Sequence, residues 1–252
     1  MEITFKDQVA LVTGGSSGIG EATAVAFAEA GAAVVIADVS DRGAEVAQRL
    51  VDGGHRAIFV KTDVSDEAQV KTMIDAAVSE FGSLDVAFNC AAYEGALGPV
   101  DAQELPDVQK VIATNLQGIW LCDKYELDQM KKQGKGAIVN CASVGGLVGV
   151  AAMPVYSATK HGVIGLTRSA ALSTATTGIR INAVCPGYVQ TPMADRLTSL
   201  APGVHEGLLS AQPIGRVGEP SEVAAAVLWL ASPLASLVTG TALAVDGGWS
   251  AQ

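Results

Sequence analysis

Three residues in the segment from Ser143 to Lys160 have side chains that together suit proton transfer. The segment reads SVGGLVGVAAMPVYSATK, with Tyr156 thirteen residues after the serine and Lys160 four residues after the tyrosine. If the chain is helical from Val155 onward, this spacing places Tyr156 and Lys160 on one helix face, about one turn apart. A phenol and an ammonium group would then share one site.

The chemistry of this pair depends on how the lysine changes the acidity of the phenol. A tyrosine has an ordinary pKa of about 10, so it is a poor base near neutral pH. An ammonium group within about 4 to 6 Å favours the phenolate and lowers that pKa toward the range in which a general acid or base works. The hydroxyl of Ser143 could hold a substrate oxygen in line with the phenol. A tyrosine and a lysine at this spacing are also common on helix surfaces, so the pair alone does not establish catalysis.

Length and composition indicate a single α/β domain that binds a small molecule. The chain has 252 residues, of which 49% are hydrophobic and 17% charged, which suffices for a sizeable core and argues against disorder. The net charge of −10 disfavours nucleic acid as a partner, because the chain would repel a polyanion. The sequence has no signal-peptide pattern and no apolar run approaching about 18 residues. We therefore expect a cytoplasmic protein that does not span a membrane.

The cysteine and histidine positions favour a protein without a metal ion. Each of Cys90, Cys122, Cys141 and Cys185 lies singly in an apolar run, with no CxxC pair, and the histidines are scattered. This pattern is typical of reduced core cysteines in a cytosolic protein.

A glycine-rich turn between an expected strand and an expected helix indicates a dinucleotide site. Residues 8–13 form a short apolar run, TGGSSGIG follows from Thr13 to Gly20, and an alanine-rich helical stretch ends at Gly31. Glycines let the backbone turn tightly and approach a pyrophosphate, whose charge is met by the N-terminus of the helix. The expected nucleotide contacts from this turn are Gly14, Ser16, Ser17, Gly18, Ile19 and Gly20.

The acidic residue after the second apolar run points to NAD as the coenzyme. The run 33–37 is continuous, as in a parallel strand buried on both faces, and Asp38 follows it eighteen residues after Gly20. A carboxylate there can accept hydrogen bonds from the ribose hydroxyls of an adenosine and would repel a 2′-phosphate. NAD is therefore favoured over NADP. Two alternatives stay open: Arg42 could bind a phosphate, and Asp38 could cap the helix that starts near Asp41.

Strands and helices alternate through the rest of the chain, which predicts a Rossmann-type doubly wound parallel sheet of about seven strands with helices on both faces. Further strands are expected at 57–61, 84–90, 136–142, 180–185 and 242–245, and helices at 66–81, 106–132, from 155 onward and at 220–231. Ligands bind at the carboxyl ends of such strands, where Asp63 could meet an adenine amino group and Val64 could pack on its ring. The less regular residues 191–218 are interpreted as a substrate lid, with a plain surface excursion as the alternative.

In their order and spacing, these motifs resemble those of the short-chain dehydrogenase/reductase family over residues 9–249. Each motif alone is modest, but together they are specific. Where the family usually has Asn-Asn-Ala-Gly, this chain has Asn89-Cys90-Ala91-Ala92, so contacts at positions 90 and 92 are not carried over. The residues that carry the resemblance are TGGSSGIG, Asp38, Asp63-Val64, Asn89 with Ala91, Asn115, Ser143, YSATK at 156–160, Pro186-Gly187, Thr191 and Asp246-Gly247-Gly248.

The resemblance implies a catalytic tetrad, which comprises Asn115, Ser143, Tyr156 and Lys160. In such enzymes the tyrosinate takes a hydroxyl proton while a hydride passes between the carbinol carbon and the nicotinamide. Lys160 would bind the nicotinamide ribose and lower the pKa of Tyr156. Ser143 would orient the substrate oxygen, and Asn115 would hold a water that links Lys160 to solvent. From the residue type alone, Asn115 could equally bond a helix carbonyl. Further nucleotide contacts are implied for Asn89, Ala91, Pro186, Gly187, Val189 and Thr191.

The sequence thus predicts an NAD-dependent dehydrogenase or reductase for a small or medium secondary alcohol or ketone. An NADPH-dependent ketoacyl reductase is an alternative that Asp38 and the acidic net charge disfavour. A catalytically silent nucleotide-binding scaffold is another, which the Tyr156-Lys160 pair disfavours.

The resemblance also implies a homotetramer, with the helices of Asn115 and Tyr156 packed across one interface. The substrate pocket should be mostly apolar and suit a hydrophobic or cyclic alcohol, with Tyr93, Glu94, Val144, Val150, Met153, Tyr188, Met193 and Leu197 as its lining.

Overall fold

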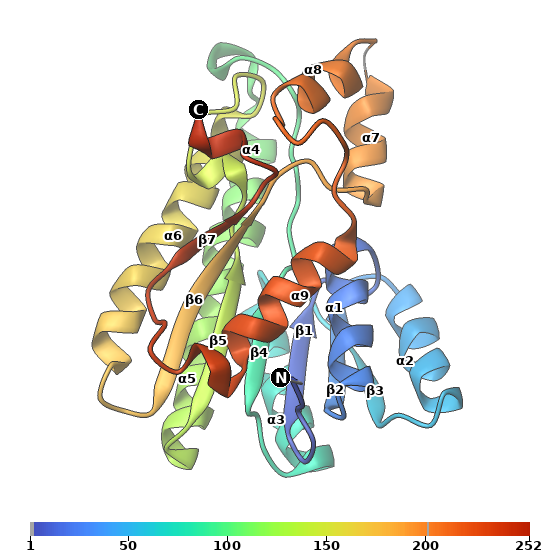
Figure 1. The fold of residues 1–252 in the computed structure, drawn as a ribbon, viewed down its shortest axis with the longest axis vertical. Coiled ribbons are helices and arrows are strands. Elements are labelled where there is room, and N and C mark those ends of the chain that lie inside the picture. Colours follow the sequence, from blue (N-terminus) through green and yellow to red (C-terminus); the bar gives the residue numbers. More distant parts are fainter. Residues whose placement is uncertain (1–2, 201) are drawn as a thin grey trace.

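Parallel strands form one continuous sheet at the centre of the molecule (Figure 1). The computed structural model describes residues 3–200 and 202–252. The sheet has seven strands in the order β3-β2-β1-β4-β5-β6-β7. This confirms the predicted doubly wound fold, and every expected strand lies within two residues of its observed bounds. The strands are β1 (Val9–Thr13), β2 (Ala33–Asp38), β3 (Ala57–Lys61), β4 (Val86–Asn89), β5 (Gly136–Cys141), β6 (Ile179–Pro186) and β7 (Ala242–Val245).

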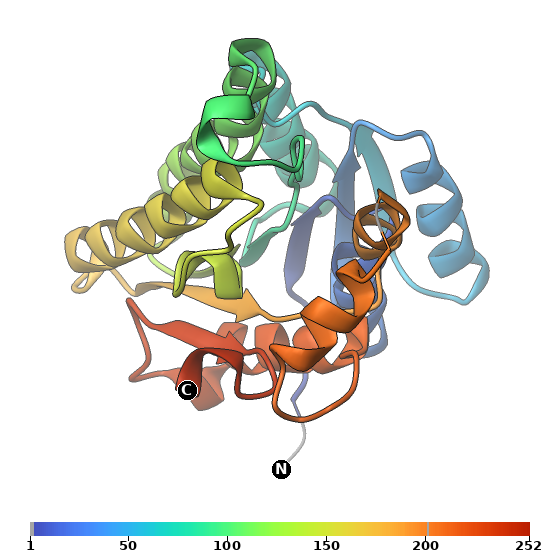
Figure 2. The ribbon, with the colours of Figure 1, turned by 90° about the horizontal axis from the view of Figure 1, so that it is seen from above.

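The central strands are mostly apolar because helices cover both faces of the sheet (Figure 2). β1 and β4 are buried at every position. Burial of one Val, Leu, Ile or Phe side chain stabilises the fold by about 1.5–3 kcal/mol, so the two packed faces supply most of its stability. One face is covered by α1 (Gly18–Glu29), α2 (Arg42–Asp52) and α9 (Pro220–Ala231), and the other by α3 (Glu67–Phe81), α5 (Gly118–Gln133) and α6 (Pro154–Thr174).

The strand order reverses between β1 and β4, which opens a crevice at their carboxyl ends. The chain moves outward from β1 through β2 to β3 and then crosses back to β4, whose Asn89 is in register with Thr13. Thr13 also ties the two loops together, because its Oγ1 accepts hydrogen bonds from the N–H groups of Cys90 (3.0 Å) and Ala91 (3.2 Å). Ligands bind at this switch point in open α/β sheets.

The helix expected over 106–132 is two helices joined by a wider turn. α4 (Leu105–Ile112) leads into a π-helical turn, Ala113–Gln117, from which α5 continues. Asn115 lies in this turn. Single π-helical turns inside longer helices occur frequently at functional sites. A π-helical turn contains one residue more than an α-helical turn. The apolar periodicity of the region does not reveal this additional residue, so the sequence predicted one helix.

The segment 191–218 is more regular than the sequence predicted. It contains α7 (Pro192–Leu200) and α8 (Val204–Ser210). Thr191 starts α7, because its Oγ1 accepts a hydrogen bond from the N–H of Ala194 at 3.2 Å, and Pro192 suits the first helical position. Pro202 and Gly203 precede α8 rather than exclude a helix.

Short 3₁₀ turns complete the fold at Val100–Ala102, Val144–Gly146, Pro233–Ala235 and Trp249–Ala251. Within residues 3–200 and 202–252, no helix combines the length and the apolar character needed to cross a membrane. In the same ranges, His, Cys, Asp and Glu side chains do not gather in threes or more where they could hold a metal ion.

Candidate active site

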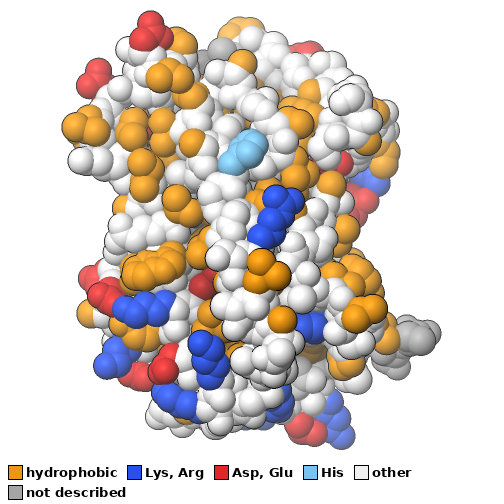
Figure 3. Space-filling view, turned by 90° about the vertical axis from the view of Figure 1, so that its left-hand side faces the viewer, with side chains coloured by type: hydrophobic (Ala, Val, Ile, Leu, Met, Phe, Trp, Pro, Cys, Tyr) orange, Lys and Arg blue, Asp and Glu red, His pale blue; other side chains and the backbone are white. Residues whose placement is uncertain are grey.

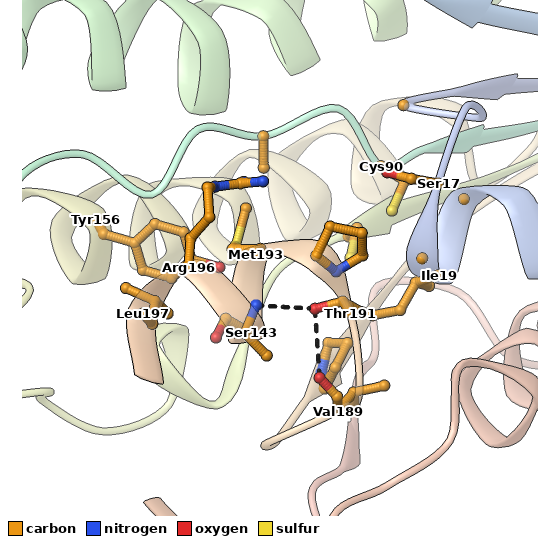
Figure 4. Close-up of a pocket in the computed structure, with 18 of the residues that line it drawn as sticks. Ser17, Ile19, Cys90, Ser143, Tyr156, Val189, Thr191, Met193, Arg196 and Leu197 are labelled. Carbon is orange, nitrogen blue, oxygen red and sulfur yellow. Dashed lines mark hydrogen bonds between the residues drawn. The ribbon is translucent and has the colours of Figure 1, made fainter. Parts of the chain in front are cut away.

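A pocket of about 510 Å³ opens at the carboxyl ends of the strands. Figure 4 shows Ser17, Ile19 and Cys90 at one end of this pocket and Ser143, Tyr156, Met193, Arg196 and Leu197 at the other. The structure therefore brings together the glycine-rich turn and the proposed proton-transfer residues, which lie far apart in the sequence. The predicted nucleotide contacts that line the pocket are Gly14, Ser16, Ser17, Gly18, Ile19, Gly20, Asp38, Tyr156, Lys160, Pro186, Gly187, Val189 and Thr191.

The glycine-rich turn presents bare backbone to the pocket. Gly14 has φ +67°, and a Cβ at this position would lie 2.8 Å from the backbone nitrogen of Ala91. Gly18 has φ +55°, and its Cβ would meet the side chain of Thr191. Ser17 is the N-cap of α1, yet its side chain accepts no capping hydrogen bond. Its hydroxyl and the first N–H groups of α1 therefore remain available to an anion, so the residues present fit a pyrophosphate.

Asp38 is held at the edge of this turn by backbone hydrogen bonds. Its Oδ2 accepts from the N–H of Ser16 at 3.1 Å and its Oδ1 from the N–H of Ser40 at 2.9 Å. Each carboxylate oxygen keeps a lone pair that can accept from a ribose hydroxyl. The residue at the N-cap of α2 is Asp41, so the alternative that Asp38 caps this helix is wrong. Arg42 lines the same end of the pocket.

A 3₁₀ turn after β5 fixes Ser143 against α6. A Cβ on Gly146 would lie 2.7 Å from the backbone oxygen of Lys160, so only glycine allows the turn to pack this closely on the helix. The Oγ of Ser143 accepts a hydrogen bond from the N–H of Gly145 at 3.1 Å. Its hydroxyl proton therefore remains available to a substrate oxygen.

Lys160 is buried beside Tyr156, as the helical spacing predicted. Its side chain is 1% exposed, and its Nζ donates a hydrogen bond to the carbonyl oxygen of Cys141 at 2.7 Å. The same Nζ lies 5.5 Å from the centroid of the Tyr156 ring. The β5 backbone thus anchors the cation next to the phenol.

The sequence predicted a lowered pKa for Tyr156, whereas in the structure this pKa is raised. Burial raises the pKa of the Tyr156 phenol, while the charge of Lys160 and the nearby hydroxyl of Ser143 lower it. Burial outweighs both effects, so the pKa of Tyr156 lies above its ordinary value in the protein alone. The sequence predicted the sign of the lysine's contribution correctly but not the larger effect of burial.

Asn115 holds a loop rather than lining the pocket. Its Oδ1 accepts from the N–H of Tyr93 and its Nδ2 donates to the carbonyl oxygen of Tyr93, both at 2.8 Å. The amide thereby links the loop after β4 to the π-helical turn. It does not bond a helix carbonyl, and Asn115 does not line the pocket. A water-holding role for this residue stays a prediction.

Asn89 faces away from the pocket. Its Nδ2 donates to Glu126 Oε2 at 2.9 Å and to Asn140 Oδ1 at 3.0 Å, on the face of the sheet that α5 covers. Side chains alternate between faces along a strand, so the neighbouring Cys90 turns to the pocket side instead. The expected contact of the Asn89 side chain with a nucleotide is therefore not supported.

Three further predicted contacts lie outside the pocket wall. Asp63 Oδ1 accepts from the N–H and the hydroxyl of Ser65, which closes the turn after β3. Val64 is buried against Gly118 of α5, and Ala91 donates its N–H to Thr13. Nucleotide contacts from Asp63, Val64 and Ala91 stay predictions.

The substrate end of the pocket is mainly apolar, as predicted. Two of the expected residues do not line it: Tyr93 donates its hydroxyl to Asp107 Oδ1 at 2.9 Å, and Glu94 pairs with Arg196. The two bonds of this pair join Arg196 Nε to Glu94 Oε1 at 2.5 Å and Nη2 to Oε2 at 3.1 Å. The expected residues that do line the pocket are Val144, Val150, Met153, Tyr188, Met193 and Leu197.

Several residues of the pocket wall were not predicted from the sequence. Arg196 shares a helix face with Met193 and Leu197, so helical spacing would have found it had α7 been recognised. Trp249 reaches the pocket because Asp246 turns the chain after β7, where its carboxylate accepts from the N–H groups of Gly248 and Ser250. No local sequence pattern predicts that the chain after β7 comes back to the pocket. The other missed residues include Cys90, Ala92, Cys141, Ala142 and Leu208.

Comparisons with known proteins match almost the whole chain. A family model described as enoyl-(acyl carrier protein) reductase matches residues 14–250. Cis-4-hydroxycyclohexanecarboxylate dehydrogenase of Sinomonas cyclohexanicum is 48% identical over 98% of this chain and 98% of its own length. Cyclohexanol dehydrogenase of Acinetobacter sp. (strain SE19) is 39% identical over 100% of this chain and 98% of its own length.

A solved structure agrees with these sequence matches. The crystal structure of levodione reductase superposes with a TM-score of 0.94 and 40% identity, covering 98% of this chain and 99% of that one. The shared fold, the motifs and the extent of the matches lead to one assignment. The chain belongs to the short-chain dehydrogenase/reductase family of oxidoreductases.

Proposed function

We propose that the protein is an NAD-dependent enzyme that interconverts cyclic secondary alcohols and the corresponding ketones. The observation that carries the proposal is the shared pocket, in which Tyr156 and Lys160 lie with the glycine-rich turn and Asp38. The names of the two related dehydrogenases, which act on cyclohexane rings, support a ring-shaped substrate.

The chain's own residues would manage the proton of the reacting hydroxyl. A bound nicotinamide dinucleotide in its oxidised form would supply the hydride acceptor and a positive charge beside Tyr156. Tyr156 accepts the hydroxyl proton as phenolate during oxidation and returns it during ketone reduction. Ser143 donates its free hydroxyl proton to the substrate oxygen, and the buried Lys160 favours the phenolate.

The pocket surface supports a hydrophobic substrate. Val144, Val150 and Met153 lie beside the proton-transfer residues, and Met193 and Leu197 approach from α7. An apolar ring fills such a surface, whereas the charged groups of a sugar phosphate would be desolvated against these apolar side chains. The reacting oxygen would be the one polar group that meets a hydrogen-bond donor and a base.

Absorbance of the reduced nicotinamide tests this proposal directly, in a panel of secondary alcohols and ketones assayed with both coenzymes. We expect kcat/KM to be higher for cyclohexanol than for open-chain alcohols or sugar phosphates. We also expect NAD to exceed NADP by more than about tenfold, because a 2′-phosphate beside Asp38 adds repulsion above about 1.4 kcal/mol. Absence of turnover across the panel would contradict the function, and a preference for NADP would contradict the role of Asp38.

We also propose that α7 and α8 form a lid over the substrate. The Glu94–Arg196 pair supports this, because it links α7 to the loop after β4, and the Glu94 side chain is only 11% exposed. Replacement of Glu94 by glutamine should raise KM for the alcohol about two- to fivefold with little change in kcat. The exposed Glu206 of α8 provides a matched control, Glu206→Gln. Equal KM values in both variants and the wild type would rule against the lid.

A homotetramer is part of the same proposal. Large apolar side chains are exposed on the helices expected at an interface, including Trp120 on α5 (47%) and Leu172 on α6 (81%). Figure 3 shows the side of the molecule on which α6 lies, where hydrophobic side chains are spread over the surface and charged ones are most frequent in the lower part. Light scattering that gives the monomer mass would contradict the proposal.

We further propose a cytoplasmic location, supported by four cysteines that are all free thiols. Recovery of the protein with exported or membrane fractions would contradict it.

A further inference from the structure

Two cysteines lie side by side in the wall of the pocket, on neighbouring strands. The last register pair of β4 and β5 is Asn89 with Asn140, so the next residues, Cys90 and Cys141, are neighbours across the strands. Both pack in the same hydrophobic cluster on the face covered by α1 and α9, and both line the pocket. Adjacent strands lie about 4.8 Å apart, within the Cα separation of about 4.4–6.8 Å that a disulfide needs. Figure 4 shows Cys90 beside the glycine-rich turn.

The two thiols have unequal acidities. The interaction between the two thiols lowers the pKa of Cys141 and raises that of Cys90 well above its ordinary value. The ammonium group of Lys160 also lowers the pKa of Cys141. Because the thiolate is the reactive form, Cys141 is suited to attack and Cys90 to act as its partner.

The other cysteines lack these properties. Cys122 lies on the opposite face of the sheet, and burial raises the pKa of its thiol well above the ordinary value. Burial raises the pKa of Cys185 to about 12. The pair is also a departure of this chain from the family pattern, since an asparagine usually stands at the position of Cys90.

We propose that Cys90 and Cys141 form a peroxide-sensitive dithiol site that closes to a disulfide in the pocket. The Cys141 thiolate attacks one oxygen of hydrogen peroxide, so that an S–O bond forms, the O–O bond breaks, and the departing hydroxide takes up a proton to become water. The Cys90 thiol then attacks the sulfenic sulfur, the S–S bond forms and a second water leaves. The dithiol is oxidised by two electrons and the peroxide is reduced to two waters.

Closure of this disulfide should disturb the active site. The carbonyl of Cys141 anchors Lys160, so movement of this residue displaces the cation beside Tyr156. On the other side, a Cβ on Gly14 would lie 3.0 Å from the carbonyl carbon of Cys90, so the glycine-rich turn has little space to adjust. A bound dinucleotide would cover both thiols and protect them. The loss of activity rests on the proposed function, whereas the cross-link itself does not.

Peptide mapping tests the cross-link without any activity assay. Cleavage after Lys and Arg places each cysteine in its own peptide, with Cys90 in 72–110 and Cys141 in 136–160. After peroxide treatment of the whole protein, we expect these two peptides to be linked with the loss of two hydrogens. The link should be absent from Cys90→Ser, present in the matched control Cys122→Ser, and suppressed by saturating NAD. Treated wild-type protein without this link, or with a link between other cysteines, overturns the proposal.

Activity provides the second readout, with each sample compared with its own untreated enzyme. We expect the linked wild-type enzyme and Cys122→Ser to lose at least about tenfold in turnover and to recover it with dithiothreitol. A cross-linked enzyme that retains full turnover would refute the effect on the pocket. If the untreated enzyme turns over no substrate in the panel, the proposed function fails while the peptide map still decides the cross-link.

Discussion

Replacement of Tyr156 by phenylalanine is expected to lower kcat for alcohol oxidation by about 100- to 10,000-fold. The substitution removes only the hydroxyl group, and positioned general acid–base groups contribute rate factors of this size. The phenyl ring fills the same space as the tyrosine ring, so the pocket that residue 156 lines should keep its shape. Initial rates at saturating alcohol and coenzyme measure the loss.

A nucleotide titration of the same variant separates lost chemistry from lost binding. The glycine-rich turn and Asp38 are unchanged, so the dissociation constant for NAD should stay within about threefold of the wild-type value. Tyr125→Phe is a matched control, because Tyr125 lies on α5 and donates its hydroxyl to the exposed Glu67. If Tyr156→Phe turns over as fast as this control, Tyr156 is not the proton-transfer group.

Replacement of Lys160 by methionine is expected to move the pH dependence of alcohol oxidation to higher pH. Oxidation requires the phenolate of Tyr156, so its rate rises with pH through the pKa of that residue. Lys160 makes the largest contribution that lowers this pKa, and its removal therefore raises the pKa further. Each unit of upward shift reduces the phenolate about tenfold near neutral pH, so we expect a loss of at least tenfold there, partly recovered in alkaline buffer.

Lys160→Arg is the matched control, because it keeps the positive charge. Its pH profile should stay closer to that of the wild type, even if the larger guanidinium fits less well beside Cys141. The methionine variant also leaves the Cys141 carbonyl without its 2.7 Å partner, which costs about 1–3 kcal/mol of stability. Circular dichroism must therefore confirm folding at the assay temperature. Coincident pH profiles in the folded methionine variant and the wild type would contradict the electrostatic role.

The sheet and the proximity of Tyr156 to Lys160 are predictable from local patterns. Continuous apolar runs identify strands buried on both faces, and the spacing of Tyr156 and Lys160 follows from the helical repeat. The TGGSSGIG pattern predicts a tight turn, and the backbone at Gly14 and Gly18 has the positive φ that such a turn needs. A side chain at either position would collide with its neighbours. These features depend on residues close together in the chain.

The contacts that the sequence did not predict join distant segments. Asn115 finds its partner in the loop at Tyr93, and Glu94 finds Arg196 on α7, so neither partner is indicated by its own neighbourhood. The net acidity of Tyr156 depends on how deeply the assembled pocket buries the phenol. Consecutive strand residues point to opposite faces of the sheet, so Asn89 points to α5 and Cys90 to the pocket.

The central claim is that a dinucleotide held by the glycine-rich turn and Asp38 brings its nicotinamide to the Tyr156 phenol. A crystal structure of the protein with NAD and a cyclic alcohol tests this claim most directly. We predict that the adenosine ribose contacts the Asp38 carboxylate and that the substrate oxygen lies within hydrogen-bond distance of both Tyr156 and Ser143. A nicotinamide ring remote from Tyr156, or Tyr156 and Lys160 side chains turned apart, would contradict it.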